Sequence, residues 1–270
     1  MLVAAALVPD TVLLLPGAAG RGPDDEVLGV LRSAAATAVA RTVAGAERVV
    51  VVAPGAATRW VVGRVRAGAG AAGVPDHLLG GPVPTVELAP APVPGLGPCT
   101  GPGADLVPDL GPRTASGTAP GPAAVVGLRL ALDAGADPGR LHVREIAADQ
   151  TDLRMLGRAA VDGARTALVV VGSGSVRHGT GAPLPADPRA QQADGDLLAA
   201  LAAGGRPARD ALAALDPALA RDLAVSGYAP WQVLVGALDA SPADPGPTDV
   251  LHAEVWRGAS HAAVVWQVAP

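Results

Sequence analysis

The residues best suited to chemistry fall in three short stretches of the chain. Asp10 follows an apolar run at the N-terminus, and a glycine-rich turn at 172–178 follows a second apolar run near the middle. His252 and Glu254 stand two residues apart, so both side chains point to one face if that stretch is a strand. Carboxylates and imidazoles are suitable ligands for transition metals, so Asp10, His252 and Glu254 are candidate metal ligands. The alternative for His252 and Glu254 is a solvated face of an edge hairpin.

The turn Gly172-Ser-Gly-Ser175 is the second feature that could carry function. Its glycines allow a sharp change of direction and leave backbone amides open. Polar side chains that follow a buried strand gather at its carboxyl end, where α/β proteins place their binding sites. Ser173, Ser175, Arg177 and His178 are therefore predicted to line any pocket there. An ordinary exit from strand to loop is the alternative.

Three familiar motifs do not fit this turn. A nucleophile elbow needs Gly-x-Ser-x-Gly, and neither Ser173 nor Ser175 has a glycine two residues away on both sides. A phosphate-binding loop needs a lysine, and the chain has none. A lone Gly-x-Gly after midchain is weak support for a dinucleotide site, which normally follows the first strand. None of the five histidines has the His-x-x-x-His or His-Glu-x-x-His spacing of a metal site on a helix.

The elements that must position these residues alternate between strands and helices. Short apolar runs, rich in valine, predict strands at 2–8, 49–53, 141–147, 166–171, 250–256 and 262–268. Helical spacing and capping residues predict helices at 24–43, 123–134, 151–164, 187–204 and 206–214, with two more that open at Asp216-Pro217 and at Pro230. The run at 166–171 has no polar alternation, which is typical of a strand covered on both faces. We therefore expect an α/β fold with a central, mostly parallel or mixed sheet, flanked by helices, and a C-terminal strand pair closed across Arg257-Gly258.

Residues 1–270 are predicted to form one domain. Between 80 and 122, prolines and glycines recur every few residues, which neither a helix nor a central strand tolerates. This Pro/Gly-rich excursion is expected to hold the least regular structure of the chain. It is interpreted as an insertion, with a lid over the strand ends as the alternative. Since the carboxyl ends of parallel strands meet at one edge, Asp10, 54–55 and 172–178 are expected to share that edge.

The composition of the chain argues against nucleic acid and membrane as partners. The formal net charge is -5, and no arginine-rich block appears, which argues against a nucleic-acid partner. Cys99 is the only cysteine, so the sequence predicts no intrachain disulfide and fits a reducing, cytoplasmic location. Pro9-Asp10 interrupts the apolar N-terminus, which is interpreted as a strand and not as a signal peptide. No apolar run approaches the roughly 20 residues that span a bilayer, so no membrane partner is expected.

Four segments together resemble one known family. They are Leu2-Val-Ala-Ala-Ala-Leu-Val-Pro-Asp10 with Leu13-Leu-Leu-Pro16, Gly172-Ser-Gly-Ser-Val-Arg177, Ala229-Pro-Trp-Gln-Val-Leu234, and the ending from 254 to 268. With them the chain resembles the class III extradiol ring-cleaving dioxygenase superfamily, and more closely its actinobacterial LigB-type subunit-B-like branch. The resemblance covers nearly the whole chain except the Pro/Gly-rich excursion. It implies a non-heme Fe(II) site with two histidines and a glutamate, another histidine as acid/base, and a catechol-type substrate.

The chain departs from that pattern at several positions. Asp10 stands where the family has its first histidine ligand, and Gly55 falls near the place of the second. Val176 occupies the place of the catalytic histidine, and His178 lies two residues further on as the candidate acid/base. Glu254 alone keeps the expected type of ligand. A glycine has no side chain to donate, and a valine cannot transfer a proton.

The resemblance therefore leads to two functional hypotheses. The first is a LigB-like homologue with a degraded iron site, no working metal cofactor and a binding or scaffold role. The alternative is an active Fe(II)-dependent extradiol dioxygenase in which Asp10, Glu254 and a histidine hold the iron. A small aromatic molecule is the partner expected in either case, and a homo-oligomer is compatible with the sequence.

Overall fold

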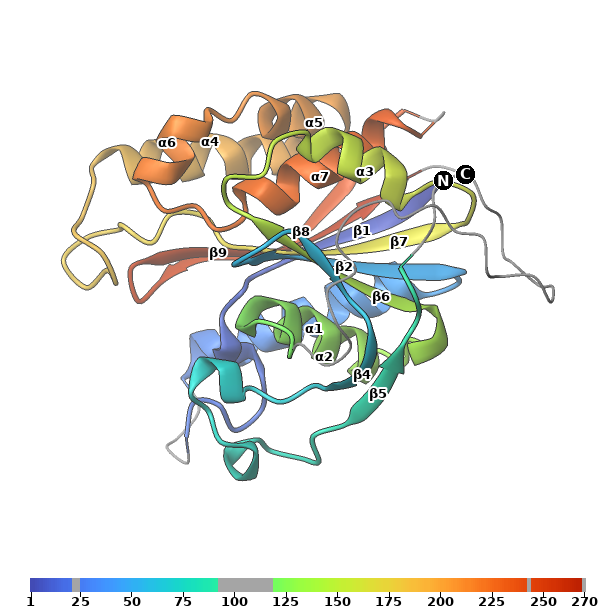
Figure 1. Cartoon of the computed structure of the whole chain (residues 1–270). Coiled ribbons are helices and arrows are strands. Elements are labelled where there is room, and N and C mark those ends of the chain that lie inside the picture. The colour runs from blue at the N-terminus through green and yellow to red at the C-terminus, as the bar shows by residue number, and fades with distance from the viewer. Residues whose placement is uncertain (21–24, 92–118, 242–243, 269–270) are drawn as a thin grey trace.

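The apolar runs of the sequence form one mixed sheet of seven strands (Figure 1). The computed structural model describes residues 1–20, 25–91, 119–241 and 244–268. The strands of the main sheet are β1 (Leu2–Val8), β2 (Arg48–Gly55), β3 (Arg59–Val61), β6 (Leu141–Ala147), β7 (Thr166–Val171), β8 (Thr248–Trp256) and β9 (Ala259–Gln267). Their order is β3-β6-β2-β7-β1-β9-β8. The four inner strands β6, β2, β7 and β1 run parallel. Strand β3 pairs antiparallel with β6, β9 pairs antiparallel with β1, and β8 pairs antiparallel with β9.

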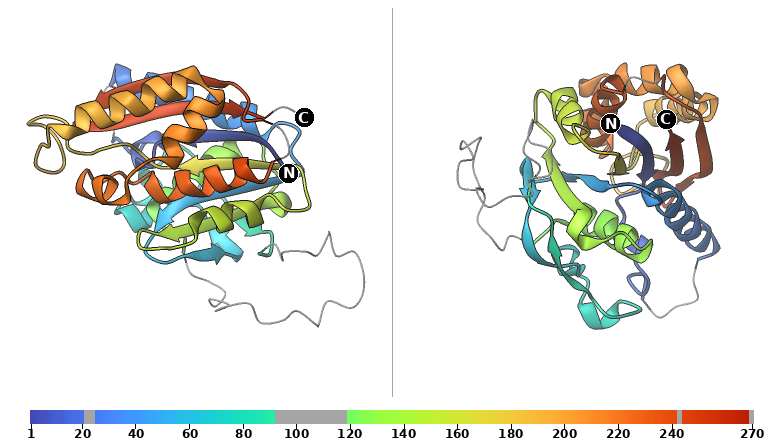
Figure 2. Two further views of the ribbon diagram at one scale, coloured as in Figure 1. Left: turned by 90° about the horizontal axis from the view of Figure 1, so that it is seen from above. Right: turned by 90° about the vertical axis from the view of Figure 1, so that its right-hand side faces the viewer.

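Helices cover both faces of this sheet (Figures 1 and 2). They are α1 (Glu26–Val43), α2 (Pro122–Asp133), α3 (Leu153–Ala160), α4 (Arg189–Ala203), α5 (Gly205–Ala213), α6 (Pro217–Asp222) and α7 (Tyr228–Asp239). The helices α1 and α2 pack on one face, and α3, α4, α5 and α7 pack on the other. A second sheet of two strands, β4 (Gly63–Arg66) and β5 (Thr85–Leu88), lies on the side of α1 and α2. The predicted fold class, a single α/β domain with a mixed sheet and a C-terminal strand pair, is confirmed.

The sheet contributes to two apolar cores because neighbouring residues on a strand point to opposite faces. Val49 and Val51 of β2 belong to the core under α1 and α2, while Val50 and Val52 belong to the core under α3 to α7. All six residues of β7 are buried, as its unbroken apolar run predicts. The centre of the sheet is therefore dry on both faces, and polar side chains can gather only at its edges and ends.

All the predicted strands and helices are observed, with ends that differ by up to a few residues, whereas β3 and β4 were not predicted. Two helix starts show why the ends differ. The helix predicted at 151–164 begins later, with Asp152 as the N-cap of α3, and the Asp152 side chain makes no capping hydrogen bond within the described structure. The last helix begins at Tyr228 and not at Pro230, with Gly227 as its N-cap residue. The turn between β8 and β9 lies at Arg257 and Gly258 as predicted, with φ angles of 51° and 74°.

The Pro/Gly-rich excursion at 80–122 holds β5 and the first residue of α2. Its central part, 92–118, lies outside the described residues. No helix in the described part of the chain is long and apolar enough to cross a membrane.

Candidate functional site

The register of the sheet brings Asp10 and Ser173 together. Val8 of β1 pairs with Val171 of the parallel strand β7, and each candidate residue follows two positions later. The Ser173 hydroxyl donates a hydrogen bond of 2.6 Å to Oδ1 of Asp10, and the Asp10 amide lies 3.4 Å from the same hydroxyl oxygen. The two sequence candidates therefore meet at the carboxyl ends of neighbouring strands, where they were expected.

His261 completes this group, and the sequence did not single it out. Strand β9 runs antiparallel to β1 with Leu7 opposite Val264, and extending this pairing by three residues sets His261 opposite Asp10. The Nδ1 atom of His261 lies 3.3 Å from the Ser173 hydroxyl. We call Asp10, Ser173 and His261 the polar triplet. Ser173 and His261 are both buried, while Asp10 is half-buried.

The hydrogen bonds of the polar triplet assign its protons. Ser173 gives its only proton to Asp10, so its oxygen accepts from the Nδ1–H of His261. Burial lowers the pKa of His261, and the attraction of Asp10 offsets this only in part, so the ring is neutral at pH 7. A neutral ring with its proton on Nδ1 keeps a lone pair on Nε2. The triplet thus presents the Asp10 carboxylate and the His261 Nε2 atom as two hydrogen-bond acceptors.

The order of these groups does not fit nucleophilic catalysis. In a serine hydrolase the histidine lies between the serine and the carboxylate and takes the serine proton. Here Ser173 lies between Asp10 and His261, and its oxygen already accepts from the His261 ring while it donates to Asp10. The structure therefore agrees with the motif spacing, which also argues against a nucleophile elbow.

His252 and Glu254 lie further along the same edge. Glu254 of β8 pairs directly with His261, so β9 separates it from Asp10. Two strand spacings amount to roughly 10 Å between backbones. The Nε2 atom of His252 is 3.4 Å from Oε2 of Glu254. In the residues that the structure describes, no three His, Cys, Asp or Glu side chains are grouped so that they could hold a metal ion. Asp10, His252 and Glu254 are therefore not gathered as one ligand set.

The position near Gly55, where the family resemblance places a second ligand, is filled by Glu145. The pairing of β2 with β7 sets Gly55 beside Ser173 when it is continued. A Cβ atom on Gly55 would lie 2.7 Å from Cβ of Glu145 and 3.3 Å from its Oε2. The buried Glu145 carboxylate accepts hydrogen bonds of 2.6 Å from Nε of Arg59 and from the amide of Gly121 before α2. Both of its oxygens are occupied, so Glu145 is tied to the start of α2.

The rest of the glycine-rich turn leads away from the polar triplet. Ser175 is fully buried, and its hydroxyl donates to the carbonyl of Leu223, while Arg177 donates to the carbonyl of Pro185. The Nε2 atom of His178 lies 2.6 Å from Oδ2 of Asp194, a buried residue of α4. Asp194 also accepts from the Ser175 amide at 3.0 Å. These four side chains therefore fasten the turn to its neighbours.

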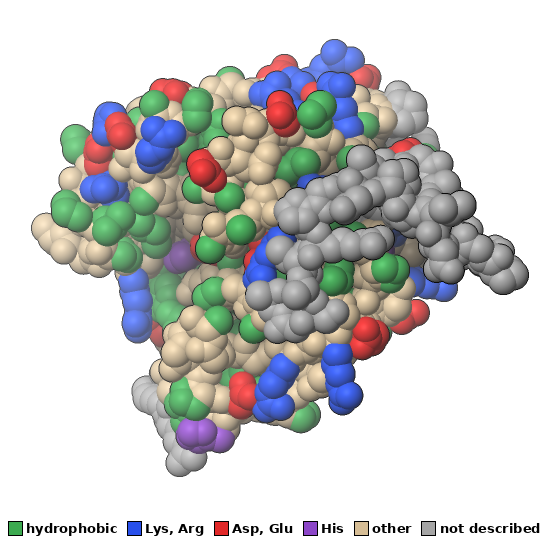
Figure 3. Space-filling model, in the orientation of Figure 1, with side chains coloured by type: hydrophobic (Ala, Val, Ile, Leu, Met, Phe, Trp, Pro, Cys, Tyr) green, Lys and Arg blue, Asp and Glu red, His purple; other side chains and the backbone are tan. Residues whose placement is uncertain are grey.

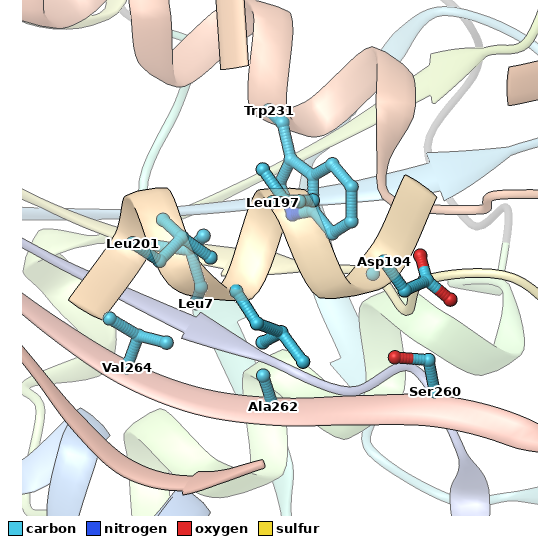
Figure 4. Close-up of a pocket in the computed structure, with 11 residues that line it drawn as sticks. Leu7, Asp194, Leu197, Leu201, Trp231, Ser260, Ala262 and Val264 are labelled. Carbon is cyan, nitrogen blue, oxygen red and sulfur yellow. The ribbon is translucent and has the colours of Figure 1, made fainter. Parts of the chain in front are cut away.

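A small cavity lies beside Asp194 on the face covered by α3 to α7 (Figure 4). Its wall is mostly apolar, with Leu7, Leu197 and Trp231 among its members, and Asp194 and Ser260 supply its polar side chains. Its volume of about 20 Å³ suits an ordered water molecule and excludes an aromatic ring. Ser260 and His261 are neighbours on β9 and point to opposite faces, so this cavity and the polar triplet lie on different sides of the sheet.

Three functional candidates were missed by sequence reasoning, namely His261, Asp194 and Glu145. His261 depends on the antiparallel register between β1 and β9, which no local pattern reveals. Asp194 lies inside an alanine-leucine helix, where a single carboxylate normally faces solvent. Glu145 lies on the same face of its strand as the apolar residues Leu141 and Val143, and a charge in that buried setting is the signal that could have identified it.

Comparisons with known proteins identify a shared fold but no activity. No family model and no curated protein matches the chain. Solved structures do match, among them the crystal structure of uncharacterized protein JW3007 from Escherichia coli K12. That match has a TM-score of 0.50 and 16% sequence identity, and it covers 97% of this chain and 99% of the other. At this identity, the likeness shows a shared fold alone.

Proposed function

We propose that this protein is a class III extradiol dioxygenase-like, LigB-type protein with a degraded iron site, and that it binds a small hydroxylated aromatic molecule without cleaving it. The observation that carries the proposal is the polar triplet, in which Ser173 joins Asp10 and His261 at the carboxyl edge of the sheet. A serine lies between the acid and the imidazole, so the triplet offers two groups that suit a metal and not the three that such an iron site needs.

The donors at this edge do not fit a ferrous iron site. Non-heme iron enzymes of this kind hold the metal by two histidines and one carboxylate that face one point. Asp10 supplies one carboxylate, but Gly55 offers no donor, and both carboxylate oxygens of Glu145 are bonded to Arg59 and Gly121. We therefore assign no reaction step to iron in this chain.

The same groups suit a ligand that carries hydroxyl groups. The Asp10 carboxylate and the His261 Nε2 atom both accept hydrogen bonds, and a catechol offers two adjacent donors. The Trp256 ring lies 6.2 Å from that of His261, which adds an aromatic neighbour at this edge. Two acceptors and an aromatic neighbour support recognition of a phenolic ring by hydrogen bonds and packing.

The competing hypothesis is an active Fe(II)-dependent dioxygenase that uses Asp10, Glu254 and a histidine. The two hypotheses differ in measurable iron content and turnover. We would purify the chain with and without ferrous iron under anaerobic conditions, quantify the bound metal, and follow ring-cleavage absorbance with catechol and protocatechuate. We expect less than stoichiometric iron and no turnover, together with catechol binding that isothermal titration calorimetry detects.

Variants connect that result to the polar triplet. Asp10→Ala should weaken catechol binding roughly tenfold or more, since a hydrogen bond to a charged group is lost. The matched control is Asp133→Ala, which removes an exposed carboxylate at the end of α2 and should bind as the native chain does. Stoichiometric iron with turnover that Asp10→Ala abolishes would establish the enzyme hypothesis. Catechol binding that is equal in all three proteins would place the ligand elsewhere.

The setting that we propose is cytoplasmic, with a small molecule as partner and no nucleic acid. A single cysteine needs no oxidising compartment. On the face shown in Figure 3, acidic and basic side chains of the described residues are interspersed, whereas nucleic-acid binding needs clustered positive charge.

A further inference from the structure

A second group of polar side chains lies at the other edge of the sheet, on the face of α3 and α7. Trp60 of β3 pairs directly with Arg144 of β6, and His142 precedes Arg144 by two residues, so all three side chains share one face. The Arg144 guanidinium carbon lies 4.8 Å from the centre of the Trp60 ring. The ring centres of Trp60 and His142 are 6.2 Å apart at an angle of 71°. We call these three residues the Arg144 cluster.

The Arg144 cluster holds buried polar atoms without partners in the described part of the chain. The Nε atom of Arg144 and the Nδ1 atom of His142 are shielded from solvent, and neither has a hydrogen-bond partner among the described residues. His142 is 9% exposed. Buried polar groups in native proteins are almost always hydrogen-bonded, and an unpaired buried charge is costly. Such atoms therefore indicate a site that a ligand completes.

The acid next to Arg144 in the sequence does not neutralise its charge. Glu145 follows Arg144 directly on β6 and so points to the opposite face, where it is paired with Arg59. Burial alone lowers the pKa of Arg144 to about 10, with no contribution from a carboxylate. The pKa of His142 falls to about 4, first through burial and then through the positive charge of Arg48. The cluster is therefore cationic, partly desolvated and without an acid among the groups that shift these two pKa values.

We propose that the Arg144 cluster binds a small oxyanion that also carries a hydroxyl group, either hydrogen phosphate or a 2-hydroxycarboxylate. The anionic oxygen accepts from Arg144, whose plane the Trp60 ring holds in place. A neutral imidazole has one nitrogen that accepts a hydrogen bond, and Nδ1 of His142, which has no partner among the described residues, can accept from the ligand hydroxyl. Residues two apart on a strand are roughly 7 Å apart, a span that one small ligand covers.

This proposal is independent of the phenol site, because it concerns other residues on the other face of the sheet. Its test uses thermal unfolding and calorimetric titration of the full chain with sodium phosphate, glycolate, acetate and chloride at one pH and one ionic strength. We expect phosphate or glycolate to raise the Tm above its value in chloride, with acetate weaker than glycolate. A larger effect of phosphate or of glycolate identifies which oxyanion the site prefers.

Arg144→Gln assigns the effect to the cluster. It should lower the association constant roughly tenfold or more, because it removes a charge-assisted hydrogen bond. In chloride its Tm should not fall below that of the native chain, since the guanidinium is half-buried and its Nε atom has no partner among the described residues. Arg64→Gln, on the exposed side of β4, is the control and should bind as the native chain does. The proposal fails if neither oxyanion acts more strongly than chloride, or if Arg144→Gln binds as tightly as the native chain.

Discussion

Two imidazoles in this protein are held neutral by burial, and they do different work. The Nδ1–H of His261 donates a hydrogen bond to the Ser173 hydroxyl oxygen, and this fixes the proton positions of the polar triplet. His142 lies against Trp60, where the charge of Arg48 adds to the effect of burial. A histidine whose folded-state pKa is depressed binds fewer protons in the folded than in the unfolded chain, so acid favours unfolding.

His142 gives a prediction for the pH dependence of stability. Its pKa falls from 6.5 in the unfolded chain to about 4 in the folded one. The free energy of unfolding should therefore decrease as the pH falls from 6.5 to 4, by at most roughly 3 kcal/mol from this residue. His142→Gln should make that decrease shallower. Urea unfolding at pH 7.5, 5.5 and 4.5 measures it.

His77→Gln is the control for this prediction, because His77 is exposed in a short 3-10 helix at 76–78 and should leave the pH profile unchanged. Equal acid slopes for the native chain and His142→Gln would show that His142 titrates normally in the folded state.

The sequence predicts contacts between residues that follow parallel strands, and it misses contacts that depend on the register of an antiparallel strand. Asp10 and Ser173 could be predicted to meet, because both follow strands whose apolar runs mark them as buried and parallel. His261 could not, because its place opposite Asp10 depends on an antiparallel register set by side-chain packing far along β9. The sequence correctly places Gly55 at the carboxyl edge of the sheet, but only the structure shows that Glu145 fills the space beside it.

Among the helices, α3 and α7 approach each other closely, and two glycines allow it. A Cβ atom on Gly157 of α3 would lie 1.9 Å from the carbonyl oxygen of Val233. A Cβ atom on Gly236 of α7 would lie 2.0 Å from the carbonyl oxygen of Arg154. Both clashes are with backbone, which cannot move aside as a flexible side chain can. The backbones of the two helices are therefore in direct contact, and their spacing depends on the absence of these two side chains.

Gly157→Ala should consequently destabilise the protein by about 3 kcal/mol or more, as overpacking against rigid backbone does. Gly195→Ala in α4 is the matched control, since no described atom lies within 4 Å of the added Cβ. There alanine should stabilise the helix by about 0.5 to 1 kcal/mol. Denaturant midpoints measure both, and a neutral Gly157→Ala would show that α3 and α7 can slide apart.

The existence of elements was easier to predict than their ends. Strands came from unbroken valine runs, and the hairpin at Arg257-Gly258 came from the short gap between two of them. Helix starts were predicted from capping residues, which worked for α6, where Asp216 accepts from the amide of Ala218. The same method was less accurate for the start of α3, where Asp152 has a φ of 56° and its side chain caps no amide in the described structure. Local capping chemistry therefore sets a helix start only where the tertiary contacts permit it.

The whole molecule is organised by one sheet that belongs to two cores. Val51 and its partner in the register, Val169, belong to the core under α1 and α2. Val50 and its partner, Leu168, belong to the core under α3 to α7. Neither core can lose its strands without exposing the apolar face of the other. The carboxyl edge of the sheet thus keeps its register only while both helical layers are in place, and the polar triplet depends on that register.

A single unfolding transition should follow from this shared sheet. Val50→Ala and Val51→Ala remove the same two methyl groups from opposite faces of β2, and each site is fully buried. Each should lower the stability by about 2 kcal/mol through lost burial and the cavity left behind. Far-UV circular dichroism and tryptophan fluorescence should shift together in both variants, because the two cores unfold as one unit. If Val51→Ala shifted only the circular dichroism signal while fluorescence kept its native midpoint, the layer of α1 and α2 would be unfolding on its own. That outcome would separate the two cores and remove the physical link between helix packing and the polar triplet.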